Sequence, residues 1–156
     1  KGAEAATLSI MIGGAAEVKR FNIHDGLGLV TLRRLGLKVG WVSSRPSAAT
    51  TQRARELKID FLRQEKGSKV ETVERLLATT GFRWDEVCYV GDDIVDLGVL
   101  KRAGVAVSVA NGVAEARAAA DYVTRASGGH GAVREVVELI LKAQDKWPRL
   151  VAEHAA

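Results

Sequence analysis

The sequence has few cysteine, proline and aromatic residues. Its 156 residues include one cysteine and two prolines, and aromatic side chains make up 5%. A single cysteine excludes an internal disulfide framework and any zinc site built from several cysteines. Cys88 lies within a short apolar run. We therefore assign it to packing inside a strand rather than to nucleophilic chemistry.

Long apolar runs are also missing. No run approaches the roughly 18 residues that span a bilayer, and the first residues lack the layout of a signal peptide. Hydrophobic residues make up 47% and charged residues 27%, which is typical of a globular domain and excludes extensive disorder. We therefore expect a single cytoplasmic domain over residues 1–156 that has no membrane partner.

The charge excess is small. Lys and Arg number 23 against 19 Asp and Glu, which gives a net charge of +4. The basic residues are spread along the chain, and the densest cluster is Arg33, Arg34 and Lys38. This favours a solvated surface over a nucleic-acid-binding stripe, so no nucleic-acid partner is expected. The same charge would help to attract a phosphorylated or carboxylated small molecule.

Short apolar segments alternate with helical patterns along the chain. A hairpin is predicted over 7–21, where apolar and polar residues alternate on both sides of a Gly-Gly pair. The strands predicted after it are 38–43, 59–62, 87–90, 105–109 and 122–123. The strand at 87–90 is a continuous apolar run, which predicts burial on both faces. Helices are predicted over 26–35 behind an Asp25 cap, 47–57, from Ser68 onward, 95–103, 113–120 and 132–144. This alternation predicts an α/β fold, a three-layer doubly wound parallel sheet with a small protruding hairpin.

Acidic residues follow the strand at 87–90. Asp92, Asp93 and Asp96 fall within five residues, and ligands of parallel sheets bind beyond the carboxyl ends of the strands. Hard oxygen ligands in that place suit Mg²⁺. The alternative is a capping carboxylate with solvated neighbours.

Two further strand ends carry polar residues. Ser43, Ser44 and Arg45 follow the apolar part, 38–42, of the strand predicted at 38–43, where a hydroxyl and the N–H groups of a helix N-terminus would bind an anion. A plain helix cap is the alternative. Lys69 follows Ser68 in the first turn of a helix, where it opposes the helix dipole. Such a misfit marks either a functional lysine or a harmless exposed one.

Taken in chain order, these residues resemble the motifs of the haloacid-dehalogenase-type phosphatases. The segments FNIHDGLG (21–28), YVGDD (89–93), ADYVT (120–124) and GGHGAVRE (128–135) resemble, more narrowly, the capless 3-deoxy-D-manno-octulosonate 8-phosphate phosphatases. The resemblance implies a Mg²⁺-dependent phosphatase that releases the free sugar acid in lipopolysaccharide precursor synthesis. It also implies a homotetramer that closes the open pocket with the hairpin and the C-terminal tail, 145–156.

The resemblance implies a role for particular residues. Asp92 would bind Mg²⁺, Lys69 would neutralise the phosphoryl charge, and Asp96 would orient Lys69 or the metal's waters. The phosphate would be held by Ser43, Ser44 and Lys69. The sugar acid would contact Arg45, Arg53 and the segment Asn22, Ile23, His24, Asp25 and Gly26. His24 and Ser44 stand where the family commonly has Arg and Gly, which bears on the substrate more than on the reaction.

One family motif is not found in these residues. The resemblance places an Asp-x-Asp motif, which carries the nucleophile and the general acid, at the end of a first strand, immediately ahead of Lys1 or overlapping Lys1 and Gly2. No Asp precedes Asp25. Either residues ahead of Lys1 supply this motif, or the protein is a variant without a nucleophile. The second interpretation predicts a catalytically silent domain with an assembly or regulatory role, as in some sialic-acid-activating enzymes.

Overall fold

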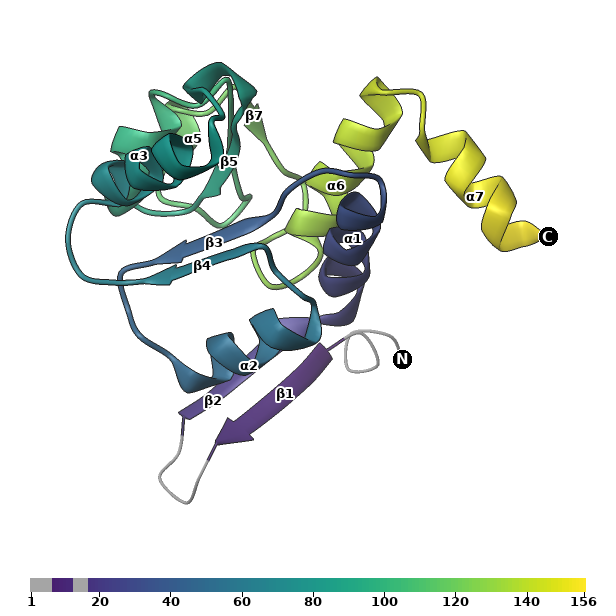
Figure 1. The fold of residues 1–156 in the computed structure, drawn as a ribbon, viewed down its shortest axis with the longest axis horizontal. Coiled ribbons are helices and arrows are strands. Elements are labelled where there is room, and N and C mark those ends of the chain that lie inside the picture. The colour runs from purple at the N-terminus through teal and green to yellow at the C-terminus, as the bar shows by residue number, and fades with distance from the viewer. Residues whose placement is uncertain (1–6, 13–16) are drawn as a thin grey trace.

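Parallel strands connected by helices make up most of the chain (Figure 1). The computed structural model describes the backbone of residues 7–12 and all of residues 17–156. The strands are β1 (Thr7–Ile12), β2 (Glu17–Asn22), β3 (Gly40–Ser43), β4 (Phe61–Gln64), β5 (Cys88–Gly91), β6 (Val105–Ser108) and β7 (Tyr122–Val123). The helices are α1 (Ile23–Arg34), α2 (Ala48–Glu56), α3 (Lys69–Thr80), α4 (Leu97–Leu100), α5 (Ala114–Ala118), α6 (Ala132–Ala143) and α7 (Trp147–Ala155), with 3₁₀ turns η1 (Trp84–Glu86) and η2 (Ile94–Asp96).

The parallel strands form two groups. β3 pairs with β4, and β5 pairs with β6, which pairs in turn with β7; every one of these pairs is parallel. No ladder between described residues joins β3 to β5, so each of these strands has one unpaired edge there. The predicted α/β class with parallel strands is confirmed. None of the described helices is long and apolar enough to cross a membrane.

β5 differs from its prediction. Cys88 is exposed, and Tyr89 and Val90 are half-buried, so the expectations of a strand buried on both faces and of a packed cysteine are wrong. The physical reason is that β6 covers only one edge of β5 among the described residues. Partial desolvation nevertheless raises the pKa of the Cys88 thiol to about 11. The thiol therefore stays protonated at neutral pH and is a poor nucleophile, as predicted.

The predicted hairpin is confirmed. β1 and β2 pair antiparallel, with Thr7 opposite Asn22 and Ile12 opposite Glu17, and α2 lies over them (Figure 1). Two side-chain contacts join β2 to α2. Ser47 Oγ donates to Glu17 at 2.9 Å, and Lys19 Nζ donates to Thr50 Oγ1 at 3.0 Å. Leu8, Ile10 and Ile12 provide the apolar positions of β1, and their side chains are outside what the structure describes.

The first three helices begin at side-chain caps, and one of these caps differs from its prediction. Ser68 caps α3 as predicted, and Ser47, predicted to begin the helix at 47–57, caps α2. Both hydroxyls accept an N–H group from the first turn. The Asp25 cap is wrong: Asn22 caps α1 by accepting the N–H of Asp25 at 3.1 Å. The Asp25 carboxylate instead accepts the N–H of Arg134 at 2.8 Å, in the first turn of α6. That partner is 109 residues away, beyond the reach of a local rule.

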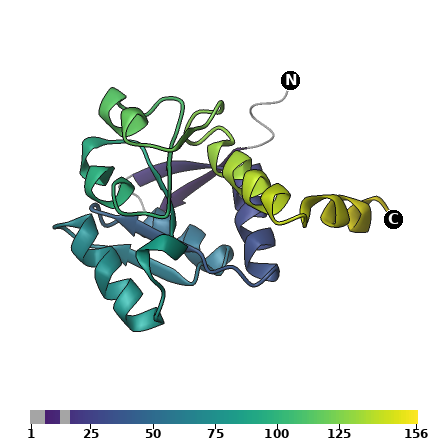
Figure 2. The same ribbon diagram turned by 90° about the horizontal axis from the view of Figure 1, so that it is seen from above.

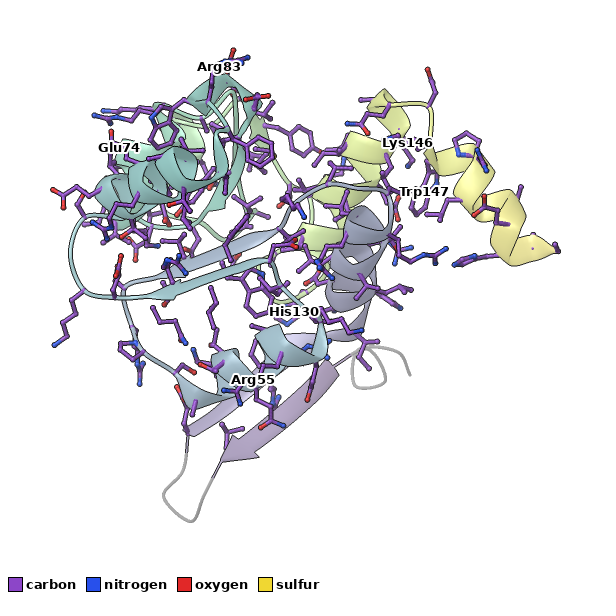
Figure 3. The ribbon with its side chains drawn as sticks, viewed as in Figure 1. Arg55, Glu74, Arg83, His130, Lys146 and Trp147 are labelled. Carbon is purple, nitrogen blue, oxygen red and sulfur yellow. The ribbon has the colours of Figure 1, made fainter. Side chains whose placement is uncertain are left out.

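The largest apolar cluster lies between α1, α6 and α7, and its buried residues include Leu29, Leu141 and Leu150. The predicted C-terminal tail is thus partly a helix, α7, which extends from the body of the protein (Figure 2). Trp147 lies at the junction of α6 and α7 (Figure 3), with Arg134 and Lys142 over its ring at 5.4 and 5.7 Å. Leu150 therefore packs on the chain's own core and is not available to a neighbouring subunit.

Candidate functional site

A buried carboxylate organises the end of β5. Asp96 is only 1% exposed and accepts four hydrogen bonds. Its Oδ1 accepts Lys69 Nζ and Tyr89 Oη, both at 2.6 Å. Its Oδ2 accepts the backbone N–H groups of Asp92 and Asp93 at 3.0 and 3.1 Å. One side chain thus joins the start of α3, strand β5 and the loop that follows it.

The charge state of Asp96 follows from these contacts. Burial acts to raise its pKa, but the hydrogen bonds from Lys69 and Tyr89 outweigh that effect, so the pKa is lowered. Asp96 is therefore ionised at neutral pH. Burial and the same carboxylate raise the pKa of the Tyr89 phenol far above its ordinary value, which keeps the hydroxyl protonated as a donor.

Lys69 is the first residue of α3, and its side chain is 14% exposed. An ammonium in the first turn is repelled by the helix dipole, and its partial burial adds a desolvation cost. The ion pair with Asp96 offsets both, which explains why the sequence tolerates a lysine there. Gly91 makes room for this pair, since a Cβ at that position would lie 2.6 Å from the Cβ of Asp96.

Asp92 directly follows β5 and remains exposed. Partial desolvation and the negative charge of Asp96 raise its pKa, and Lys69 opposes that rise. A cation bound to Asp92 would relieve this repulsion. Asp96 has no free oxygen for a metal, because each of its oxygens already has two donors.

The side chains near Asp92 fit the ligand requirements of Mg²⁺. Among residues 17–156, no three His, Cys, Asp or Glu side chains gather as a metal cage. Mg²⁺ does not need such a cage, because it keeps several waters and takes one or two carboxylates together with substrate oxygens. The carboxylate of Asp92 fits that pattern, and the described residues add no competing ligand set that would suit zinc.

The predicted anion site lies ahead of α2, whose first N–H groups have partners within the chain. The N-terminal N–H groups of α2 are occupied: Thr50 donates to Ser47 Oγ at 3.1 Å, and Glu17 accepts from Ser47 and from the backbone of Ala49. These hydrogen bonds, with Ser47 first, lower the pKa of Glu17, so a carboxylate of the chain already fills this position. Ser43 remains at the carboxyl end of β3, and α3 packs against this strand. The Ser43 hydroxyl accepts the N–H of Arg45 at 3.1 Å, and no hydrogen bond among the described residues joins it to Lys69 or Asp92.

The residues predicted to face the sugar acid fall into three groups. Arg53 and Gly26 lie together: Arg53 is 9% exposed, and a Cβ on Gly26 would clash with its guanidinium. Nη1 of Arg53 donates to Glu56 at 3.1 Å, and its buried Nε has no partner. Two of the others serve the fold, since Asn22 caps α1 and Asp25 holds α6. The exposed side chains are Ile23, His24 and Arg45.

Burial raises the pKa of Asp25 above its ordinary value, although the N–H groups of Arg134 and Gly131 oppose the shift. The carboxylate therefore links the start of α1 to the start of α6 rather than lying free in a pocket. Tyr89 was missed by the sequence reasoning altogether. The only available signal was an aromatic hydroxyl three positions before Asp92, and a strand pattern does not say that such a group reaches a buried acid.

Comparisons with known proteins agree with this arrangement. A haloacid dehalogenase-like hydrolase family matches residues 41–136. A 3-deoxy-D-manno-octulosonate 8-phosphate phosphatase from Yersinia pestis is 40% identical over 130 residues, which cover 83% of this chain and 70% of the relative.

Two solved structures extend the match to the fold. The phosphatase of this name from Moraxella catarrhalis, solved with magnesium, phosphate and the sugar acid KDO, is 36% identical with a TM-score of 0.86, over 94% of this chain and 84% of that one. A cobalt-bound form from Haemophilus influenzae is 30% identical with a TM-score of 0.81, over 86% and 80%. With its Lys69–Asp96 pair beside Asp92, this chain belongs to the haloacid dehalogenase-like hydrolases, and within them to the 3-deoxy-D-manno-octulosonate 8-phosphate phosphatase family.

Proposed function

We propose that the protein is a Mg²⁺-dependent phosphomonoesterase that hydrolyses 3-deoxy-D-manno-octulosonate 8-phosphate to the free sugar acid and phosphate. The observation that carries this proposal is the Lys69–Asp96 pair, 2.6 Å long and largely buried, at the strand end that also bears Asp92. A lysine held there by a buried acid supplies a fixed positive charge for a phosphoryl group. The relatives described above are named as phosphatases of this substrate.

In this proposal each residue of the site has one task. Lys69 neutralises charge on the transferred phosphoryl group, and Asp96 holds Lys69 and the Asp92 backbone in place. Asp92 would hold Mg²⁺, which when bound supplies charge stabilisation of the phosphoryl oxygens. Ser43, with the backbone N–H of Ser44, would hold one phosphate oxygen at the end of β3. Arg45, Arg53 and the loop at the start of α1 would contact the sugar acid.

The nucleophile is the remaining requirement. We propose that a strand with the paired-Asp motif lies between β3 and β5, because both have an unpaired edge among the described residues. Such edges are costly to leave open. A strand in that place would end beside Ser43 and Asp92, where one Asp would attack phosphorus and the other would protonate the leaving oxygen. The coding sequence immediately upstream of Lys1 tests this point, and the absence of an Asp-x-Asp motif there would favour the silent-domain alternative.

Phosphate release from 3-deoxy-D-manno-octulosonate 8-phosphate tests the function directly. The natural protein should release phosphate only with Mg²⁺, and Asp92→Ala should abolish the release. Asp85→Asn is the matched control, because Asp85 is an exposed acid paired with Arg83 away from the end of β5. If the natural protein releases no phosphate from any sugar phosphate, this function is refuted.

Assembly and location are further parts of the proposal. A homotetramer is supported by exposed apolar side chains near the hairpin and on α7, among them Val18, Leu27 and Val151 at 53%, 50% and 49% exposure. Light scattering after size exclusion should give about four times the 16.7 kDa chain mass. Val18→Asp and Val151→Asp should reduce it, and a monomer at micromolar concentration would refute the tetramer. The lone free cysteine suits a reducing cytoplasm, and cell fractionation checks that location.

A further inference from the structure

Tyr89 is a polar contact of the site that the roles above do not use. Its hydroxyl donates to Oδ1 of Asp96 at 2.6 Å, and Lys69 Nζ donates to the same oxygen at the same distance. The two donors come from different elements, β5 and α3. One carboxylate oxygen is therefore shared by a phenol and by the ammonium that faces the phosphoryl site.

The phenol is the better anchored of the two donors. The ring of Tyr89 packs against a buried cluster formed by Leu100, Ala106 and Ala116. A tyrosine hydroxyl is positioned by two side-chain torsions, whereas an ammonium at the end of four methylenes is free to sample many positions. The other oxygen of Asp96 is held by two backbone N–H groups. Tyr89 and the two backbone N–H groups thus hold the Asp96 carboxylate in one position, and Lys69 is the flexible donor of the four.

We propose that Tyr89 is a positioning residue for phosphoryl transfer. By holding Oδ1 of Asp96 it fixes the direction from which that oxygen receives Lys69, and so where the ammonium stands relative to the phosphoryl group. Without the hydroxyl, the carboxylate oxygen would follow the lysine instead of fixing it. This inference rests on the proposed phosphatase function. It predicts a loss in the chemical step rather than in substrate binding, because a displaced charge matters most where charge develops.

The test compares two tyrosines. In Tyr89→Phe we expect kcat for the sugar phosphate to fall about tenfold while KM changes less than about threefold. Tyr122→Phe is the matched control. Its hydroxyl also donates to a carboxylate at 2.6 Å, that of Glu135, whose other donors are the backbone N–H groups of Arg125 and Ala126. The control should lose similar thermal stability and keep its kcat.

A double variant separates positioning from general loosening. If Tyr89 acts through Lys69, adding Tyr89→Phe to Lys69→Met should cost no further activity. If the two losses multiply, Tyr89 does not act through Lys69. Equal kcat values for Tyr89→Phe and Tyr122→Phe would also overturn the proposal and leave a purely structural role.

Binding of inorganic phosphate with Mg²⁺, measured by calorimetry, keeps this inference distinct from the proposed function. Tyr89→Phe should weaken phosphate binding only about two- to threefold relative to Tyr122→Phe, within the change expected in KM. A wild-type protein that binds phosphate but releases none from the sugar phosphate refutes the function, and the affinity difference then decides the role of Tyr89. An active wild type with equal phosphate affinity and kcat in both variants overturns the role of Tyr89 alone. A protein that neither releases nor binds phosphate overturns both.

Discussion

Replacing Asp96 by Asn tests the buried ion pair at the centre of the site. The substitution keeps the side chain's shape but removes the charge that Lys69 faces across 2.6 Å. Both oxygens of Asp96 act only as acceptors. The amide NH₂ group of Asn would therefore face groups that donate. The variant therefore loses one charge pair and gains at least one donor-to-donor contact in a position that is 1% exposed.

The size of the effect follows from the burial of the two partners. Breaking a buried ion pair by removing one partner costs about 3–5 kcal/mol. Because Lys69 keeps 14% of its side-chain surface exposed and can turn toward water, we expect the lower end, about 3 kcal/mol. For a chain of this length that corresponds to a fall in Tm of about 6–12 °C.

The assay is urea unfolding of wild type and variant followed by circular dichroism. Asp85→Asn is the control, since its partner Arg83 is 71% exposed, and exposed pairs contribute at most about 1 kcal/mol. Removing both charges in Asp96→Asn/Lys69→Met should recover part of the stability, because no unpaired charge is left buried. If Asp96→Asn costs no more than Asp85→Asn, the ion pair does not stabilise the fold and the reasoning fails.

Other parts of the fold give sharper single measurements. Asp60 has a lowered pKa because Arg33 donates to it, so its contribution is present above about pH 4 and is lost as pH falls; the stability of wild type should therefore decline more steeply from pH 5 to 2 than that of Asp60→Asn. Leu141→Ala, at a fully buried position, should cost about 3 kcal/mol in chemical unfolding, and a loss below about 1 kcal/mol would contradict the core assignment. Gly91→Ala should reduce phosphatase activity far more than Gly40→Ala, whose added Cβ would meet only ordinary contacts at 3.6 Å; equal activity would contradict the close packing on Asp96.

Local chemistry was readable from the sequence. Ser47 and Ser68 cap their helices because a cap depends on a hydroxyl three residues before the N–H it accepts. The hairpin and the parallel strands follow from alternation and from apolar runs of the right length. The order of Ser43, Lys69 and Asp92 along the chain was enough to indicate the family, because each residue follows a predicted strand or begins a predicted helix.

Contacts between distant segments were decided by the tertiary structure alone. Asp25 accepts an N–H group from the first turn of α6 rather than from its own helix, because folding brings Arg134 to it across 109 residues. Glu17 accepts from Ser47 and from the backbone of Ala49 at the N-terminus of α2 because the hairpin packs there, a contact that no local pattern predicts. The sequence alone determined which residues are able to carry charge, cap a helix or pair in a strand. Only folding decided that Tyr89 and Lys69 meet on one oxygen of Asp96, because that meeting requires three elements to pack around a carboxylate with almost no access to water.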